Sequence, residues 1–368
     1  MSTPTASQGM SLAAFRPRRT LRVPAHSVDR PSWPTISSHE HLGPVFGGDR
    51  SRRPVADLMA AMDRVGIQTI VDLDGGQGDA LSRHIERVQE PYPERVAVFA
   101  GLDYAAWSSE AAFGEREAAA LRDSASRGAR GLKVWKHLGL IARDPAGQLV
   151  AVDDARLDPL WATAAELGLP VIIHIADPVA FFDPLDATNE RWEELQEHPD
   201  WHFWPPRGHA GGPGYPGFDE LLDGLDRMIG RHPATTFVGA HVGCAAEDLE
   251  LVGAMLERHP NYHVDIAARV AELGRQPYGA RRFFLRWRDR IMFGTDSAVN
   301  LDTCRIYYRF LETFDESFDY STDPVAPQGR WQIHGLGLPG DVLRQVCADN
   351  ARRVLGLRND VSPAGLTR

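Results

Sequence analysis

The chain has 368 residues, of which 43% are hydrophobic and 24% charged, a composition typical of a folded globular protein rather than a disordered chain. With 40 Lys and Arg against 50 Asp and Glu, the formal net charge is −10. This argues against nucleic acid or an anionic membrane as the main partner, because both need a basic surface.

No apolar run approaches the roughly 20 residues of a membrane span. The three cysteines, Cys244, Cys304 and Cys347, are scattered along the chain, so we expect no disulfide framework. This cysteine usage is typical of a reducing compartment, and we therefore expect a cytoplasmic protein.

After an N-terminal tail over residues 1–30, short apolar or β-branched runs alternate with helical stretches. The runs predicted as strands are residues 35–39, 67–73, 96–102, 131–135, 171–175, 236–241, 262–266 and 291–296. The segments predicted as helices are 54–65, 79–90, 110–127, 153–167, 218–231, 246–258 and 301–313. About eight strand–helix repeats predict the α/β class, as one (β/α)₈ TIM-barrel domain over residues 31–368.

Two segments are longer than a barrel needs. Residues 176–217 follow the fifth predicted strand and are rich in Pro, Gly, Trp, Phe and His. Because barrel active sites form where the strands end, we interpret this insertion as a lid over a substrate pocket. A structural excursion or an oligomer contact would leave the same pattern. Residues 314–338 form the second long segment, and residues 339–356 predict a C-terminal closing helix.

Histidine and aspartate side chains stand at the ends of four predicted strands. His39 and His41 end the first strand two positions apart and therefore share a face. His174 ends the fifth strand, His241 the sixth and Asp296 the eighth. These strand ends converge on one mouth of a barrel, where polar groups are seldom buried without a purpose. The pattern predicts a site for a divalent cation.

The same positions resemble the amidohydrolase superfamily, most closely its branch of small metal-dependent hydrolases and decarboxylases. The matching segments are His39-Glu40-His41, Gly239-Ala240-His241, Gly294-Thr295-Asp296 and residues 349–356, within a resemblance that covers roughly residues 34–356. The resemblance implies that the metal ligands are His39, His41, His174 and Asp296. It also implies that Asp296 shuttles a proton and that His241 either ligates a second metal or polarises the substrate.

Lys133, on the fourth predicted strand, has more than one interpretation. In two-metal members of the superfamily a lysine here is carboxylated and bridges the metals, so Lys133 and His241 are candidate bridging or second-metal residues. A charged lysine beside a cation would be repelled, so an inward Lys133 requires carboxylation, a lowered pKa or an acidic partner. A lysine that extends to the rim is the alternative. With Lys133 inward, strand alternation places Trp135 inward and Lys136 outward.

Candidates for substrate contacts come from the insertion and from the region after the seventh strand. Arg269, Arg275 and Tyr278 could hold a substrate carboxylate through hydrogen bonds. Arg191 and Trp201 could provide a polar contact and an aromatic wall. For any single arginine, surface ion pairing is the commoner role. Further polar residues that end predicted strands are Asp72, Asp74, Asp103, Tyr104 and Asp265.

Together these residues predict a metal-dependent hydrolase that uses activated water to cleave an amide, lactone or ester of a small polar molecule. Zn²⁺ is the expected cofactor, and Mn²⁺ or Fe²⁺ also suits His and carboxylate ligands. Asp296 would accept the proton of the water, and His241 would stabilise the oxyanion.

Two alternatives stay open: a metal-dependent carboxy-lyase acting on a small unsaturated or aromatic acid, and a barrel that only binds a ligand. We expect a small molecule as the partner, and homo-oligomerisation is left open.

Overall fold

The computed structural model describes residue 11 and residues 20–43, 53–205, 214–297 and 299–357. The strands are β1 (Thr35–Glu40), β2 (Ile67–Asp72), β3 (Val96–Val98), β4 (Leu132–Val134), β5 (Val171–Ile173), β6 (Phe237–Gly239), β7 (Tyr262–Asp265) and β8 (Ile291–Met292). All are parallel and form two hydrogen-bonded ladders, β1-β2-β3 and β4-β5-β6-β7-β8.

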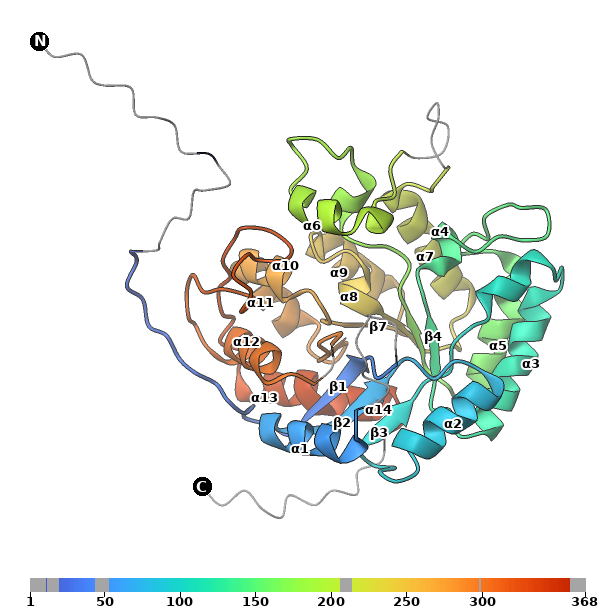
Figure 1. Ribbon diagram of the computed structural model, residues 1–368, viewed down its shortest axis with the longest axis horizontal. Coiled ribbons are helices and arrows are strands. Elements are labelled where there is room, and N and C mark those ends of the chain that lie inside the picture. Colours follow the sequence, from blue (N-terminus) through green and yellow to red (C-terminus); the bar gives the residue numbers. More distant parts are fainter. Residues whose placement is uncertain (1–10, 12–19, 44–52, 206–213, 298, 358–368) are drawn as a thin grey trace, which may run out of the picture.

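Backbone hydrogen bonds join the two ladders at both edges. Between β3 and β4, Ala100 N donates to Gly131 O at 2.9 Å and Lys133 N donates to Ala100 O at 2.7 Å. Beyond the ends of β1 and β8, Asp296 N donates to His39 O at 2.9 Å. The strands therefore close on themselves as the predicted TIM barrel (Figure 1).

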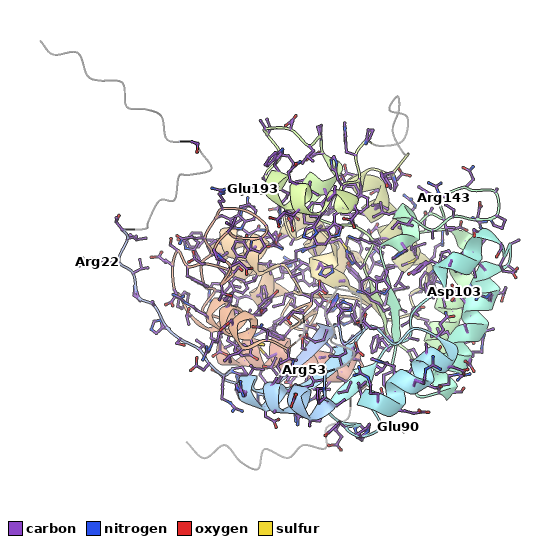
Figure 2. The ribbon with its side chains drawn as sticks, viewed as in Figure 1. Arg22, Arg53, Glu90, Asp103, Arg143 and Glu193 are labelled. Carbon is purple, nitrogen blue, oxygen red and sulfur yellow. The ribbon has the colours of Figure 1, made fainter. Side chains whose placement is uncertain are left out.

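Helices surround the barrel (Figure 1). They are α1 (Val55–Val65), α2 (Gly78–Val88), α3 (Phe113–Ser126), α4 (His137–Leu140), α5 (Asp158–Glu166), α6 (Trp192–Glu197), α7 (Phe218–Arg231), α8 (Ala240–Gly243), α9 (Leu249–Arg258), α10 (Val270–Arg275), α11 (Pro277–Arg286), α12 (Leu301–Glu312), α13 (Gly340–Arg344) and α14 (Asn350–Val354). Charged side chains such as Arg143 and Glu90 lie near the edge of the molecule (Figure 2). In the described residues, no helix combines the length and the apolar character needed to cross a bilayer.

Apolar strand residues pack on both faces of the sheet, as a parallel barrel requires. Val71, Ile172, Val238 and Met292 belong to one buried cluster, and Leu355 of the closing segment packs against them. That segment is the predicted closing helix, but a π-helical turn over Gln345–Asp349 separates α13 from α14.

The prediction of an N-terminal tail concerns mainly residues 1–10 and 12–19, which lie outside the described residues. Nearer the barrel, the chain is held against α12 and the segment after it. His26 N donates to Asp315 Oδ2 at 2.7 Å, and Ser32 N donates to Glu312 Oε1 at 2.8 Å. Residues 20–34 contain no helix or strand, yet part of this segment is docked on its own barrel.

Candidate metal centre

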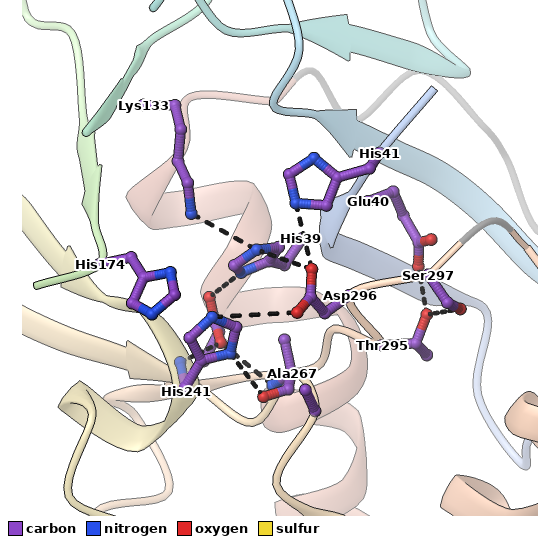
Figure 3. A network of polar contacts seen from close by, with 12 residues as sticks. His39, Glu40, His41, Lys133, His174, His241, Ala267, Thr295, Asp296 and Ser297 are labelled. Carbon is purple, nitrogen blue, oxygen red and sulfur yellow. Dashed lines mark hydrogen bonds and ion pairs between the residues drawn. The ribbon is translucent and has the colours of Figure 1, made fainter. Parts of the chain in front are cut away.

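Two carboxylates fix the imidazole rings at the end of β1. His39 Nδ1 lies 2.9 Å from Asp265 Oδ2, and His41 Nδ1 lies 2.7 Å from Asp74 Oδ1. The opposite nitrogens, both Nε2, face Asp296 Oδ1 at 3.4 Å from His39 and 3.1 Å from His41 (Figure 3). Carboxylates behind metal-binding histidines orient the rings in this way, so Asp74 and Asp265 fit that supporting role.

The chain reaches the mouth through strained turns after β6 and β8. Asp296 has φ 58°, and His241 and Val242 have φ 59° and 57°. Residues other than glycine seldom adopt this left-handed conformation, and for a β-branched residue such as Val242 it is rarer still. Backbone strain of this kind persists only where the surrounding structure holds it in place, and it is found most often at functional sites.

The donor atoms of His39, His41 and Asp296 lie within 4.8 Å of one another, a spacing that fits one divalent cation. A second grouping, of His39, His241 and Asp265, meets the same distance criterion. In that grouping, however, Asp265 Oδ1 already accepts the backbone N–H groups of His241 and Ala267, and Oδ2 faces His39 Nδ1. The first grouping therefore fits a metal better.

The charges of the cluster follow from burial and from close neighbours. Burial lowers the pKa of His39, His174 and His241, so these rings are neutral. Burial acts in the same direction on His41, but the carboxylates of Asp296 and Asp74 outweigh it and raise the pKa of His41 to about 9. Burial opposes ionisation of Asp296, but the surrounding histidines hold its pKa well below the ordinary value.

His174 lies at the edge of this cluster. Its Nε2 is 3.3 Å from Asp177 Oδ1, and its ring centroid is 4.4 Å from that of His241. Among the described residues, His174 belongs to none of the groups whose donor atoms could share one ion. The predicted fourth ligand is thus close to the site, with Nε2 turned toward Asp177.

The ring of His241 is oriented by a backbone carbonyl group. Its Nδ1 lies 2.8 Å from Ala267 O, and a carbonyl oxygen only accepts, so Nδ1 carries the proton of the neutral ring. Its Nε2 is then an acceptor, 3.9 Å from Asp296 Oδ2. A neutral ring in this tautomer accepts a hydrogen bond at Nε2 and does not donate one, so the stabilisation of an oxyanion by His241 stays a prediction that requires the protonated ring.

Lys133 points into the barrel, and its Nζ lies 3.4 Å from His39 Nε2 (Figure 3). The side chain is fully buried, and burial lowers its pKa. The alternative of a lysine extended to the rim is therefore not observed. Trp135 lies inward as expected, with its ring 5.0 Å from that of His41. Lys136 was expected outward but lines the cavity and pairs with Asp177, because β4 ends at Val134 and alternation stops there.

A cavity of about 850 Å³ opens over the histidines and Asp296. The insertion after β5 supplies part of its wall, including Phe181, Trp201 and Phe203. The second long segment supplies Tyr320 and Gln328 to the wall. These two residues were not predicted from the sequence, although the unusual length of residues 314–338 indicated a functional segment. Residues 206–213 of the predicted lid lie outside the described residues.

The predicted substrate contacts divide into two groups. Trp201 and Arg269 line the cavity. Among the described residues that line it, Arg191, Arg275 and Tyr278 do not occur. Arg191 is buried between Glu194 and Glu272, Arg275 pairs with Glu190 at 2.9 Å, and Tyr278 is 79% exposed on α11. We therefore no longer assign these three to the substrate, since a strand pattern does not determine which way the following helices turn.

A TIM barrel that carries histidines and an aspartate at its strand ends is typical of one class of metal-dependent enzymes. The sequence profile of the amidohydrolase family matches residues 32–357, so the chain belongs to this family, as the resemblance implied. The comparison with curated proteins finds no match.

Solved structures with a similar fold include an uncharacterised TIM-barrel protein, Bb4693 from Bordetella bronchiseptica. It is 17% identical with a TM-score of 0.52, over 88% of this chain and 98% of that one. A 2,6-dihydroxybenzoate decarboxylase from Rhizobium is 17% identical with a TM-score of 0.51, over 88% and 98%. An amidohydrolase II is 13% identical with a TM-score of 0.50, over 88% and 99%. At these identities the likeness shows the fold.

Proposed function

We propose that the protein is a metal-dependent hydrolase that cleaves an amide, lactone or ester of a small molecule. His39, His41 and Asp296 would hold the cation, with His174 as the candidate fourth ligand. When bound, Zn²⁺ or a similar cation such as Mn²⁺ or Fe²⁺ lowers the pKa of water and polarises a carbonyl group. The family membership and the donor set of the cluster support this proposal.

The observation that carries the proposal is the pair of acceptors formed by His241 Nε2 and Asp296 Oδ2, 3.9 Å apart in the cavity wall. A water oxygen that lies about 2.8 Å from both atoms would see them at an angle of roughly 90°, which suits two donated hydrogen bonds. The neutral His241 ring would accept the proton of the attacking water, and ionised Asp296 would stabilise the resulting imidazolium. His241 would then return the proton to the leaving group.

A carboxy-lyase is the second candidate, favoured by the buried guanidinium of Arg269 in the cavity wall. A carboxylic acid could be held there while its carboxyl group is exchanged for a proton. The 2,6-dihydroxybenzoate decarboxylase of similar fold acts, by its name, on such an acid. A two-metal arrangement with carboxylated Lys133 and with His241 as a ligand is the alternative metal centre, since Lys133 Nζ lies close to His39.

A small-molecule partner, a cytoplasmic location and a substrate contact through Trp201 are parts of the same proposal. The aromatic character of the cavity wall supports the contact with Trp201, whose ring stacks on His198 at 3.9 Å between centroids.

Metal analysis combined with activity on the purified protein tests the assignment. The His39→Ala and Asp296→Asn variants should lose metal and activity together, whereas His198→Ala, which lines the cavity outside the cluster, should keep its metal. The His241→Asn variant should keep its metal and lose roughly 10²–10⁴-fold in rate, the usual effect of removing a positioned base. Ester, lactone, amide and carboxylic acid panels should be assayed for hydrolysis and for released CO₂.

Each result has a distinct meaning. Full metal content in His39→Ala would contradict the ligand assignment. Loss of about half the metal in His241→Asn would favour the two-metal centre. Release of CO₂ without hydrolysis would favour the carboxy-lyase, and a metal-free, inactive wild-type protein that cannot be loaded would favour a barrel that only binds.

A further inference from the structure

A histidine in the outer layer of helices contacts a carboxylate behind the candidate metal centre. His84 lies in α2, three residues after the buried Leu81, so it is on the face that this helix turns toward the barrel. Its Nε2 bonds Asp72 Oδ2, and Asp72 is fully buried at the end of β2. Because a carboxylate oxygen accepts, Nε2 is the donor of this hydrogen bond.

The other oxygen of Asp72 binds the backbone on both sides of the contact between His41 and Asp74. Asp72 Oδ1 accepts the backbone N–H of Leu42 at 3.0 Å and that of Asp74 at 3.3 Å. Leu42 directly follows His41, and Asp74 Oδ1 lies 2.7 Å from His41 Nδ1. One carboxylate therefore fixes the two backbone segments whose side chains meet in the orienting contact of the His41 ring.

The hydrogen bond from His84 affects how Asp72 holds this backbone. Of the donors in the described part of the chain, only His84 reaches Asp72 Oδ2, and Asp72 has no exposed surface through which water could replace it. A buried carboxylate oxygen without a donor is costly, so the side chain would turn toward another donor if His84 were lost. That movement would weaken the bonds from Oδ1 to Leu42 and Asp74, because both oxygens belong to one rigid group.

A second histidine–carboxylate pair in the helical layer provides a comparison. His259 Nε2 lies 2.9 Å from Asp226 Oδ1, and its side chain is 12% exposed against 13% for His84. Asp226, however, is 31% exposed, and its other partner is the side chain of Arg258 at 2.7 Å. This pair has a similar imidazole contact without a connection to the metal centre, which makes His259 a matched control.

We propose that His84 is a positioning residue of the candidate metal centre: by donating to Asp72 it fixes the backbone at Leu42 and Asp74, and through them the orientation of the His41 ring. Its role in metal binding rests on the proposed function, whereas its effect on the backbone at Leu42 does not. Among the described residues that line the cavity His84 does not occur, so it acts through Asp72 and not on a ligand directly.

Two substitutions separate the hydrogen bond of His84 from the packing of its ring. His84→Gln places an amide nitrogen at a reach similar to that of Nε2 and keeps the donor, whereas His84→Phe keeps a ring and removes the donor. Competition with a chelator measures the affinity for Zn²⁺. His84→Phe should lower this affinity by about tenfold, the lower end of the usual loss for a supporting group, and His84→Gln should keep most of it.

Amide hydrogen exchange of the metal-free protein gives a readout that needs no metal. Exchange at Leu42 should accelerate in His84→Phe and return toward the wild-type rate in His84→Gln, because the bond from Leu42 N to Asp72 weakens only when the donor is lost. The amide of Leu73, which donates to Glu40 O at 3.0 Å between the strands, is the internal control and should be unchanged.

A double variant tests the route of the effect. His84→Phe should lower Zn²⁺ affinity less in an Asp74→Asn background than in the wild type, because both changes act on the orientation of the same His41 ring. His259→Phe and His259→Gln should leave both the affinity and the exchange at Leu42 unchanged.

Equal Zn²⁺ affinity in His84→Phe and the wild type would overturn the proposal. An affinity kept in His84→Phe but lost in His84→Gln would overturn it as well, since the ring would then act through packing alone. Additive losses in the double variant would overturn the route through Asp74. If His84→Phe does not fold, His84→Ala removes the same donor with less volume, and the comparison with His84→Gln is unchanged.

Failure of the metal assignment has a different signature. A wild-type protein that binds no Zn²⁺ would contradict the proposed metal centre and, with it, the role of His84 in metal binding. Exchange at Leu42 would then decide alone whether His84 fixes this backbone: faster exchange in His84→Phe but not in His84→Gln would support that part, and equal rates would overturn it.

Discussion

Asp74 and Asp265 determine which imidazole nitrogens of the β1 histidines face the cavity. Asp74 also accepts the backbone N–H of Gly43 at 2.7 Å, so this loop and the His41 ring are held by one carboxylate. An oriented ring loses less freedom when it binds a metal, and its basicity is raised by the carboxylate behind it. A substitution at one of these carboxylates should therefore weaken metal binding without removing a proposed ligand.

We expect Asp74→Asn to lower metal affinity by about 10–100-fold, the usual effect of losing such a supporting carboxylate. Asp103→Asn is the control, because Asp103 also follows a strand but pairs with Arg116 and is partly exposed, at 43% of its side chain. Competition with a chelator measures both affinities. An unchanged affinity in Asp74→Asn, or an equal loss in both variants, would contradict the role of Asp74.

The protonation of His41 predicts how metal affinity depends on pH. With a pKa of about 9 in the metal-free protein, His41 is protonated at pH 7, whereas His39, His174 and His241 are neutral. A metal binds only the neutral ring, so binding must release this proton, and affinity must fall as the pH falls below about 9.

Between pH 7 and 8.5 the apparent affinity should rise by about tenfold per pH unit, and the rise should level off near pH 9. Calorimetry in buffers of different ionisation enthalpy counts the released proton directly. In Asp74→Asn the levelling should begin at a lower pH, because one of the carboxylates that raise the pKa of His41 is gone. A flat profile in the wild type would show that His41 is already neutral.

At the scale of elements, the turn after β6, which carries His241, approaches a buried tyrosine at Gly243. The Oη of Tyr262 is buried and has no hydrogen-bond partner among the described residues. A Cβ added at Gly243 would lie 2.4 Å from this Oη but 3.6 Å from Cζ, and Gly243 also has φ +65°. The turn requires glycine at position 243 for two separate reasons. The backbone there has a positive φ, and the Tyr262 hydroxyl leaves no room for a Cβ.

We predict that Gly243→Ala destabilises the wild type by about 2 kcal/mol or more, from the positive φ and from the overlap with Tyr262. Tyr262→Phe alone should be nearly neutral, because it removes a polar atom that gains no hydrogen bond. When Gly243→Ala is combined with Tyr262→Phe, only the cost of the positive φ should remain, so the two changes should couple by about 1 kcal/mol or more.

Urea unfolding of the single and double variants measures this coupling. Gly147→Ala is the control for φ alone, because Gly147 has φ +74° and a Cβ there meets no atom within 4 Å. Additive effects of Gly243→Ala and Tyr262→Phe would show that the hydroxyl does not restrict the turn.

The strands and the polar side chains at their ends could be predicted from sequence because each depends on a local pattern. Apolar runs mark the strands, and a polar side chain at the end of such a run, as at Asp296, has only the barrel mouth to face. The side-chain contacts beyond the strand ends could not be predicted. His174 Nε2 lies beside Asp177, and Lys136 pairs with Asp177 instead of facing outward. Both contacts depend on loop conformations, which follow no periodic sequence pattern.

At the scale of the whole molecule, an ion pair buried at the root of the insertion joins it to the barrel. Arg191 precedes α6 and contacts Glu194 of α6 at 3.0 Å, and it also bonds Glu272 of α10. Its guanidinium lies 5.2 Å from the ring of Trp331, which belongs to the second long segment. One side chain thus links three segments that are distant in sequence, and each of them supplies residues to the wall of the cavity.

We predict that Arg191→Ala destabilises the protein by about 3–5 kcal/mol, because it leaves the buried carboxylate of Glu272 without its cation. Arg275 provides a matched control: it lies 4.1 Å from the same Trp331 ring, but its side chain is 35% exposed and its partner Glu190 is 42% exposed. Arg275→Ala should therefore change stability by no more than about 1 kcal/mol. Denaturant unfolding gives both values, and hydrogen exchange over residues 176–205 should accelerate in Arg191→Ala alone. Equal losses in the two variants would mean that the stacking on Trp331, which both arginines share, holds the insertion instead of the buried ion pair.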